Sequence, residues 1–592
     1  MNLDRLDFSI PTLSQAYQSG VTVDAVLGEV RRRVSLAGDN PIWINLLSND
    51  DLRSYVERLR EVKPSTLPLY GIPFAIKDNI DLAGVRTTAA CEAFSYTPSE
   101  SAFVVERLIS AGAVPIGKTN LDQFATGLVG TRSPWGAVRN SFDSGYIAGG
   151  SSAGSAVSVA LGQVSFALGT DTAGSGRIPA AFNNLVGFKP TRGLLSTRGV
   201  VPACRTLDCI SIFGLTVADT KRIFDAALAF DGQDPYARPP TAICESIATI
   251  GIPLPNQLDF EGNHEYREAF ARATATLPFE INTIDINPLL EAGKLLYEGA
   301  WVAERYHAAR TLIQDAPDSL RPEFREIMAT ASDQSAVDYF EGAYRLASLR
   351  RVTESMLAGV DAFLLPTAPT HYTICQISAD PISKNAVLGR FTNFMNLLDL
   401  CGIAIPAGTL TNGCPFGITL AADRQRDGAL LSAAQKILCR SPRQLGATGV
   451  ITSEPLLLPA ACETIAIAVC GAHLTGMPLN SQLQERGSHL REQTRSAPHY
   501  HLYALPGGPP FRPGMVRNEQ TGASIELEVF DMPLVHLGSF LQGVTAPLGL
   551  GKIELESGEW VTGFICEPHG IIDAEDITSF GSWRAYIQSL KP

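Results

Sequence analysis

Up to about residue 440, the apolar positions have the spacing of a helix in some stretches and that of a strand in others. Leu52, Val56 and Leu59 have the spacing of one helix face, within a stretch at residues 12–62 that is predicted to be helical, and the pattern returns at 102–111. Short apolar runs of strand type occur between and after such helices, at Ala113–Gly117, Ala362–Pro366 and Ile403–Pro406. Helices that alternate with short strands predict an α/β fold with a mixed sheet and functional loops at the strand ends.

A second domain is predicted after residue 440. Asp427–Leu438 has the pattern of a last helix for a first domain at 1–440, whose helical N-terminal part covers about 1–65. Residues 441–462 are rich in Ser, Pro, Gly and Thr, which is typical of a linker. The domain at 463–592 is predicted to be mainly β or α+β from its short strands at Thr464–Cys470, Tyr500–Ala504, Ala523–Phe530 and Trp560–Cys566.

Composition and charge limit the kinds of molecule that the protein is expected to bind. The 592 residues are 45% hydrophobic and 18% charged, which is ordinary for a globular protein with large cores. A net charge of −13 argues against a nucleic-acid surface and against binding to an anionic membrane. The most apolar stretch, Leu456–Ala472, is interrupted by Pro459 and Glu463, so no membrane span is expected. A small-molecule substrate is the expected partner.

The N-terminal segment and the cysteines indicate in which cellular compartment the protein is expected. Met1–Tyr17 lacks a basic segment followed by a continuous apolar segment, so no signal peptide is expected. The eleven cysteines are scattered, include no Cys-x-x-Cys pair and have no histidines beside them. This pattern is typical of reduced thiols and predicts a cytoplasmic protein without disulfides or zinc. Three of them, Cys91, Cys401 and Cys470, have apolar neighbours and are expected in cores.

Small residues are concentrated between Gly149 and Thr191, where two glycine-rich turns flank one apolar strand. Glycine-rich turns can bind phosphate, but neither the P-loop pattern nor a strand-linked Gly-x-Gly-x-x-Gly is present. The serines here would need a base to act as nucleophiles. The first histidine is His264 and no Gly-x-Ser-x-Gly occurs, so a Ser-His-Asp arrangement is poorly supported.

A lysine is the alternative base. Residues 69–76 form an apolar, strand-like run that leads directly to Lys77-Asp78-Asn79. Burial at a strand end removes solvation from an ammonium group, lowers its pKa and favours a neutral amine that accepts protons. A solvated surface lysine is commoner in general but fits the end of an apolar strand less well.

These segments together resemble the amidase signature family, whose fold is a central mixed sheet surrounded by helices. The matching pieces are Lys77-Asp78-Asn79, the Gly-Gly-Ser-Ser-Ala-Gly-Ser run at 149–155 and the Gly-Thr-Asp-Thr-Ala-Gly-Ser-Gly-Arg run at 169–177. The resemblance implies a cofactor-free and metal-free Ser-Ser-Lys triad in which Ser175 is the nucleophile, Ser151 bridges after a cis peptide bond and Lys77 is the base. It implies an oxyanion hole formed by the amides of Thr172, Ala173, Gly174 and Ser175. The other serines, Ser152 and Ser155, are expected to cap the next helix or bond its backbone.

A predicted helix at Leu289–Leu312 makes the family resemblance more specific. It carries Tyr297, Trp301 and Arg305 at steps of four residues, which places them on one stripe. For an arbitrary helix this would be an aromatic core stripe with a surface arginine. Here it resembles the allophanate hydrolases of the amidase family, which use a tyrosine and an arginine at this spacing to hold a substrate carboxylate. A planar guanidinium suits that role because it donates two parallel hydrogen bonds.

The second domain adds to this resemblance. Residues 469–480 resemble the opening motif of the allophanate hydrolase C-terminal domain, which is similar to the γ-glutamyl cyclotransferase fold. His473 lies in this motif and is a candidate for catalysing a decarboxylation, although a histidine that fixes a turn through hydrogen bonds is an equally reasonable interpretation.

The resemblance implies hydrolysis of allophanate to ammonia and carbon dioxide by a homodimer that associates through the amidase domain. In this scheme Ser175 forms an acyl-enzyme, water releases N-carboxycarbamate, and the C-terminal domain promotes its decarboxylation. The alternatives are another amidase, such as a broad aliphatic amidase or one component of a tRNA-dependent amidotransferase, and a non-catalytic scaffold. The second domain and the Tyr297/Arg305 pair argue against the other amidases, and the complete triad argues against the scaffold.

Overall fold

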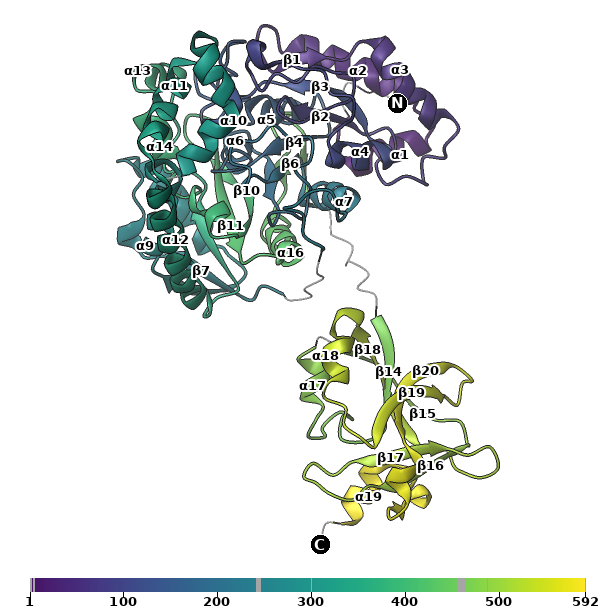
Figure 1. Cartoon of the computed structure of the whole chain (residues 1–592). Helices are drawn as coiled ribbons and strands as arrows, with labels where there is room; N and C mark the ends of the chain where they lie inside the picture. Colours follow the sequence, from purple (N-terminus) through teal and green to yellow (C-terminus); the bar gives the residue numbers. More distant parts are fainter. Residues whose placement is uncertain are drawn as a thin grey trace. The chain divides into compact units, whose positions relative to one another are not determined.

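A computed structural model describes residues 3, 6–240, 246–299, 301–454, 464–486 and 488–590 (Figure 1). The described residues up to 454 form one compact unit, and those from 464 onward form a second. In the predicted linker, 443–452 forms a short hairpin, β12 (Arg443–Gln444) and β13 (Ile451–Thr452), and Asn184 donates to the carbonyls of Gln444 and Gly446 in the first unit. The remaining part, 455–462, lies outside the described residues.

The first unit is built on one sheet of eleven strands, with parallel and antiparallel pairs. In order across the sheet they are β1 (Trp43–Leu46), β3 (Val114–Thr119), β2 (Pro73–Lys77), β4 (Phe166–Thr170), β6 (Ile210–Gly214), β5 (Val186–Lys189), β10 (Cys401–Thr409), β11 (Pro415–Ala422), β9 (Ala362–Pro366), β7 (Thr249–Pro253) and β8 (Glu280–Ile284). The predicted mixed α/β sheet is confirmed. The strands expected at 362–366 and 403–406 belong to it as β9 and β10.

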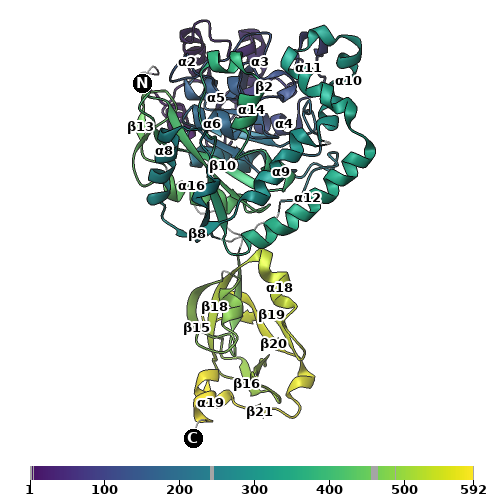
Figure 2. The ribbon, with the colours of Figure 1, turned by 90° about the vertical axis from the view of Figure 1, so that its left-hand side faces the viewer.

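Helices surround this sheet. The stretch predicted to be helical at 12–62 forms three helices, with β1 between the second and third, and the last predicted helix has the expected bounds. Figure 2 shows α9 to α12 gathered along one side of the unit. The helices are α1 (Ile10–Gln18), α2 (Val23–Leu36), α3 (Asn49–Arg60), α4 (Phe103–Ser110), α5 (Ala153–Ala160), α6 (Arg177–Phe182), α7 (Val217–Ala227), α8 (His264–Ala275), α9 (Asn287–Glu298), α10 (Trp301–Asp315), α11 (Pro322–Ala329), α12 (Ala336–Leu357), α13 (Ile374–Ala379), α14 (Ser383–Leu388), α15 (Phe394–Leu397) and α16 (Asp427–Leu438).

One expectation about these elements is wrong, and another is right except for its bounds. The helix predicted at 289–312 is interrupted, because Gly299 ends α9 in an extended conformation and α10 begins at Trp301. Glycine has a low helix propensity, which favours a break at this point. The strand predicted at 113–117 is present as β3, which begins at Val114 and continues to Thr119. Lys118 of this strand is fully buried, and its Nζ pairs with the buried Asp78 carboxylate at 3.1 Å.

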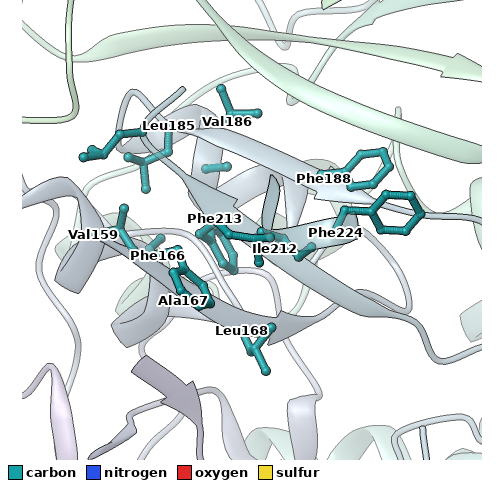
Figure 3. Close-up of a cluster of buried hydrophobic side chains, with 14 of the residues drawn as sticks. Val159, Phe166, Ala167, Leu168, Leu185, Val186, Phe188, Ile212, Phe213 and Phe224 are labelled. Atoms are coloured by element: carbon teal, nitrogen blue, oxygen red, sulfur yellow. The ribbon is translucent and has the colours of Figure 1, made fainter. Parts of the chain in front are cut away.

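The core explains why the strands at the centre of the sheet are so apolar. Figure 3 shows side chains of β4, β5 and β6, among them Phe166, Phe188 and Ile212, packed in one cluster. Phe74 of β2 stacks on Phe166 of β4 with 5.0 Å between ring centroids. Both rings are fully buried, and burial of such side chains drives formation of the sheet.

Strand direction then sets the position of the polar residues. Strand β2 is parallel to its two neighbours, β3 and β4. The carboxyl ends of parallel strands meet at the same edge, so Lys77 at the end of β2 lies beside Thr170 at the end of β4. The loop that follows β3 begins at this edge as well.

The second unit has a five-stranded sheet and a three-stranded sheet around its own apolar core. Two predicted strands have the expected bounds, one ends a residue early, and the one expected at 523–530 is found at 526–533. Across the larger sheet the strands are β15 (His489–Arg495), β18 (Glu526–Pro533), β14 (Thr464–Val469), β20 (Trp560–Cys566) and β19 (Leu548–Glu554); the smaller contains β17 (Pro513–Arg517), β16 (Tyr500–Ala504) and β21 (Glu575–Asp576), and the helices are α17 (Ser481–Gln484), α18 (Leu537–Leu541) and α19 (Trp583–Ser589). Among the helices of the described ranges, none is long and apolar enough to cross a bilayer.

Candidate active site

Lys77 is fully buried at the carboxyl end of β2 and contacts two hydroxyl groups. Its Nζ is 2.7 Å from Ser151 Oγ and 2.7 Å from Thr170 Oγ1. In the described part of the chain Lys77 forms no ion pair. Burial lowers the pKa of Lys77 to about 7, against a partial opposing effect of the carboxylates of Asp122, Asp208 and Asp171. The base predicted from the sequence therefore has the burial, the lowered pKa and the hydroxyl partner that the prediction requires.

Each of these three carboxylates is bonded to other groups. Asp122 accepts hydrogen bonds from the amides of Val129, Gly130 and Arg132. Asp208 accepts from Thr172 Oγ1 at 2.5 Å and from the amides of Ala203 and Cys204, and burial raises its pKa to about 6. Asp171 pairs with Arg177. The carboxylates therefore act on Lys77 only from a distance, and a neutral amine remains accessible near neutral pH.

Ser151 follows the glycine turn and is placed by contacts of its backbone. The Gly150–Ser151 peptide bond is cis, as the family resemblance implies. The Ser151 carbonyl accepts from the Asp122 amide at 3.1 Å. A Cβ at residue 150 would lie 2.2 Å from Asp122 Oδ2, so only glycine allows this close approach. Ser152 and Ser155 donate to the carbonyls of Thr170 and Leu168, so they fix α5 to β4; the expectation that they cap the helix or bond its own backbone is corrected.

Ser175 lies in a loop organised by Asp171. The Asp171 carboxylate forms two hydrogen bonds of 2.9 Å with the Arg177 guanidinium and accepts from the amides of Gly174 and Gly176. Burial alone would raise the pKa of Asp171, but the Arg177 cation outweighs it and keeps the pKa low. Ser175 Oγ donates to the Gly127 carbonyl over 3.4 Å, and the described hydrogen bonds do not join it to Ser151. This long contact leaves the hydroxyl weakly held.

The amides expected to form an oxyanion hole fall into two groups. Within the described residues, the amides of Thr172, Ala173 and Ser175 donate to no protein acceptor. The Gly174 amide, expected as a fourth donor, is bonded to Asp171 Oδ1 at 2.8 Å, so this part of the prediction is corrected. Three backbone donors remain for a developing oxyanion.

Tyr297 and Arg305 lie on two different helices but are in contact. The Arg305 guanidinium carbon lies 4.9 Å from the centre of the Tyr297 ring. Arg305 is only 2% exposed; its Nη1 donates to Thr126 Oγ1 at 3.2 Å, whereas its Nε and Nη2 have no partner among the described residues. A buried cation with two free donor nitrogens is costly unless an anion binds there.

Other residues of the site were not singled out from the sequence. Thr170 and Asp171 lie inside the 169–177 run, but the sequence alone indicates no role for them. No sequence pattern points to Thr126. Thr392 Oγ1 donates to the Ala173 carbonyl at 2.6 Å, and Asn396 Nδ2 donates to the Asp171 carbonyl at 2.7 Å. Only the fold reveals these contacts with the nucleophile loop, because Thr392 and Asn396 are distant from it in the sequence.

His473, the candidate of the second unit, lies in the turn after β14. Its ring stacks on Phe564 with 5.1 Å between centroids, and Nε2 is 3.1 Å from Gln482 Oε1. Burial lowers the pKa of His473. Asn480 Nδ2 donates to its carbonyl at 2.9 Å, so the turn is fixed through the backbone and the ring has a defined orientation. No group of three or more His, Cys, Asp or Glu residues within the described ranges could hold a metal ion.

Comparison with known proteins supports this interpretation. Residues 39–431 match the family model "Amidase", and residues 465–588 match "Allophanate hydrolase C-terminal domain". Urea amidolyase of Saccharomyces cerevisiae is 43% identical over 93% of this chain, but the chain spans only 31% of that protein's length. The structure of a serine-to-alanine variant of Kluyveromyces lactis allophanate hydrolase is 39% identical, with a TM-score of 0.82 and complete coverage of both chains. A glutamyl-tRNA(Gln) amidotransferase component of Streptococcus pneumoniae is 33% identical, over 62% of this chain and 82% of its own.

The chain therefore belongs to the amidase family. With the additional C-terminal match, it has the domain content of an allophanate hydrolase-like amidase.

A neutral Lys77 predicts how nucleophile reactivity depends on pH. Covalent labelling of Ser175 by a fluorophosphonate should accelerate as pH rises through about 7, since only the unprotonated amine can accept a proton. The measurement is the labelling rate between pH 5.5 and 8.5, with the modified residue located by mass spectrometry. Lys77→Met should abolish the pH-dependent component. A rate independent of pH, or labelling of another serine, would contradict the assignment.

Proposed function

We propose that this protein hydrolyses allophanate, releasing ammonia in the amidase unit and carbon dioxide after a second step. The observation that carries the proposal is the arginine with free donors beside the nucleophile. Arg305 bonds Thr126, and Ser175 Oγ bonds the carbonyl of the next residue, Gly127. A carboxylate held by Arg305 therefore places the rest of a small substrate next to Ser175. Allophanate has a carboxylate at one end and a carboxamide at the other.

The chemistry follows from the hydroxyl and amine groups of the site. Neutral Lys77 takes a proton from Ser151 while Ser151 takes one from Ser175, and Ser175 Oγ bonds to the terminal carboxamide carbon. The free amides of the nucleophile loop stabilise the oxyanion, Ser151 returns a proton to the nitrogen, and ammonia leaves. Water then cleaves the acyl-enzyme and releases N-carboxycarbamate. We assign its decarboxylation to the second unit, with His473 as the proposed catalytic group.

The nucleophile assignment predicts that Ser175→Ala eliminates ammonia release from allophanate. The expected loss is about 10⁶-fold in kcat, because one hydroxyl carries the acyl transfer and the triad acts as a unit. Lys77→Ala should be similarly severe, and combining the two should add little. Ammonia is measured by a coupled enzymatic assay. The control is Ser158→Ala, a buried serine whose hydroxyl bonds, within the described residues, only the Ser155 carbonyl. Near-normal ammonia release by Ser175→Ala would refute the assignment.

The carboxylate assignment predicts a loss that depends on substrate charge. Arg305→Ala should reduce kcat/KM for allophanate, and the reduction should correspond to a loss of about 2–5 kcal/mol of transition-state stabilisation, because a buried charge pair is lost. Biuret, in which a neutral amide replaces the carboxylate, should be far less affected. The control is Arg310→Ala, an exposed arginine on the same helix. An equal loss on both substrates would show that Arg305 is structural.

We also propose that the protein is a homodimer through the amidase unit, and one helix face supports this. Along α12 the apolar side chains of Val337, Phe340 and Tyr344 are 66%, 54% and 69% exposed at helical spacing. Exposed apolar stripes of this kind mark protein interfaces. The first turns of α12 carry Asp338 and Glu341, and a later turn carries Arg350 and Arg351, of which Arg351 pairs with Glu354. Two copies of α12 packed antiparallel about a two-fold axis would place the acidic end of each beside the basic end of the other.

This interface predicts that Phe340→Asp combined with Tyr344→Asp produces a monomer, because burying four carboxylates at a two-fold contact is costly. The mass is measured by sedimentation equilibrium. The control is Leu36→Asp, because Leu36 on α2 is 70% exposed and lies away from α12. A wild-type monomer, or a dimer that survives the double substitution, would refute the proposed interface.

A further inference from the structure

Thr126 connects the arginine of the carboxylate site to the loop that contacts the nucleophile. It is buried, with 2% of the residue exposed. Its Oγ1 accepts a hydrogen bond from Arg305 Nη1 at 3.2 Å and donates one to the Phe124 carbonyl at 3.2 Å. A hydroxyl can take both roles at once, because it has one proton and two lone pairs. Among the residues that the structure describes, this hydroxyl is the hydrogen-bond partner of Arg305, since Nε and Nη2 have none.

The turn that carries Thr126 has a constrained backbone. Phe124 and Ala125 both lie in the left-handed region, with φ values of 49° and 52°. Residues other than glycine stay in this region only where their surroundings hold them, and such strain is concentrated at functional sites. Here the Thr126 amide donates to the Gln123 carbonyl at 3.0 Å. Gln123 is itself held, because its Nε2 donates to the Ala90 carbonyl at 2.9 Å.

A second buried arginine fixes the backbone of Thr126. Arg132 is also 2% exposed; its Nη1 donates to the Thr126 carbonyl at 3.1 Å, and its Nη2 donates to the Pro381 carbonyl at 2.6 Å. The Arg132 amide donates to the Asp122 carboxylate at 2.9 Å, so both ends of this loop are joined. Thr126 is β-branched, which also restricts rotation about its Cα–Cβ bond. Its hydroxyl therefore presents a fixed acceptor to Arg305.

The residue after Thr126 contacts the nucleophile. The Gly127 carbonyl accepts a hydrogen bond from Ser175 Oγ over 3.4 Å. A Cβ at residue 127 would lie 2.6 Å from Asp122 Oδ2, so glycine is needed for this close turn. One peptide unit therefore separates the group that holds Arg305 from the group that contacts Ser175. This short link sets the distance between a carboxylate bound to Arg305 and the attacking oxygen.

Small linear substrates of this kind differ mainly in that distance. In allophanate one nitrogen atom lies between the carboxylate carbon and the carboxamide carbon, whereas a longer homologue has two atoms there. Displacement of a reacting group by about 1 Å can reduce a rate on the order of 100-fold, so a fixed spacing discriminates by length. Without the Thr126 hydroxyl, Arg305 would lose its hydrogen-bond partner and its guanidinium could adopt other rotamers.

We propose that Thr126 is a positioning residue that selects substrates by length. It acts through Arg305, because its hydroxyl holds the guanidinium at the distance from Ser175 that suits one atom between the two carbonyl carbons. The ligand class is a short carboxylate with a second carbonyl group one atom away. This proposal rests on the proposed function, in which Arg305 binds the carboxylate of the substrate.

Protection of Ser175 tests this selection without requiring turnover. Malonate and succinate, which place one and two carbon atoms between their carboxylates, compete with fluorophosphonate labelling of Ser175 in the full-length protein. The wild-type protein should be protected by malonate at a lower concentration than by succinate. Thr126→Val keeps the side-chain shape but removes the hydroxyl, so it should weaken protection by malonate about tenfold and reduce the preference for malonate over succinate. Thr126→Ser keeps the hydroxyl and should retain this preference.

Each protection constant compares labelling with and without the dicarboxylate in the same variant, so a change in the labelling rate itself cancels. The control is Thr220→Val, a buried threonine whose hydroxyl bonds, within the described residues, only the Thr216 carbonyl. Equal protection of the wild-type protein by malonate and succinate overturns the proposal. An unchanged preference in Thr126→Val, or an equal loss in Thr126→Ser, overturns it as well.

Ammonia release from allophanate then tests whether Thr126 acts through Arg305. Thr126→Val should reduce kcat/KM in the otherwise wild-type protein but add little to Arg305→Ala, because the effects of residues that act through one contact are not additive. A loss of the same size in both backgrounds overturns this role. Absence of ammonia release by the wild-type protein refutes the proposed function instead, and the protection experiment still decides whether Thr126 selects by length.

Discussion

The site depends on a lysine that is buried without a counter-ion in contact. Removing an ammonium group from water is costly, and protein interiors reduce that cost by pairing or by deprotonation. Here the hydrogen-bond partners of Lys77 among the described residues are two hydroxyl groups, those of Ser151 and Thr170. The nearest carboxylates are satisfied elsewhere, by backbone amides, by Thr172 and by Arg177. The neutral amine is thus substantially populated near neutral pH, and the fold provides a base without histidine.

The same contacts also give the nucleophile loop its shape. The Asp171–Arg177 pair is fully buried, and it uses the amides of Gly174 and Gly176 to bend the chain around Ser175. Removing either partner would leave an uncompensated buried charge, which is worth several kcal/mol. Contacts from Thr392 and Asn396 to the Ala173 and Asp171 carbonyls link this loop to the segment before β10. The donors that remain free are the ones available to a substrate.

The sequence predicted the parts of this arrangement that are encoded locally. Short-range patterns were enough to predict the apolar run before Lys77, the glycine-rich turns and the helix at 427–438. The alternation of helices and short strands also predicted the mixed sheet. Contacts between distant segments could not be predicted in this way. The engagement of the Gly174 amide depends on how Asp171 folds back, and the contact of Arg305 with the Tyr297 ring depends on how α9 and α10 meet. The His473 turn approaches the start of β17 only because residue 471 is glycine, since a Cβ there would lie 2.3 Å from Pro513 Cδ.

The central claim is that Lys77 loses its proton near neutral pH because it is buried without a paired carboxylate. Its direct test is a titration of the Lys77 side chain by nitrogen-15 NMR in protein labelled at lysine, with the signal assigned by its loss in Lys77→Met. The account predicts a midpoint near pH 7, with the neutral amine predominating above it. A midpoint near the ordinary lysine value of about 10.4 would contradict the account, because Lys77 would then be charged throughout the working range.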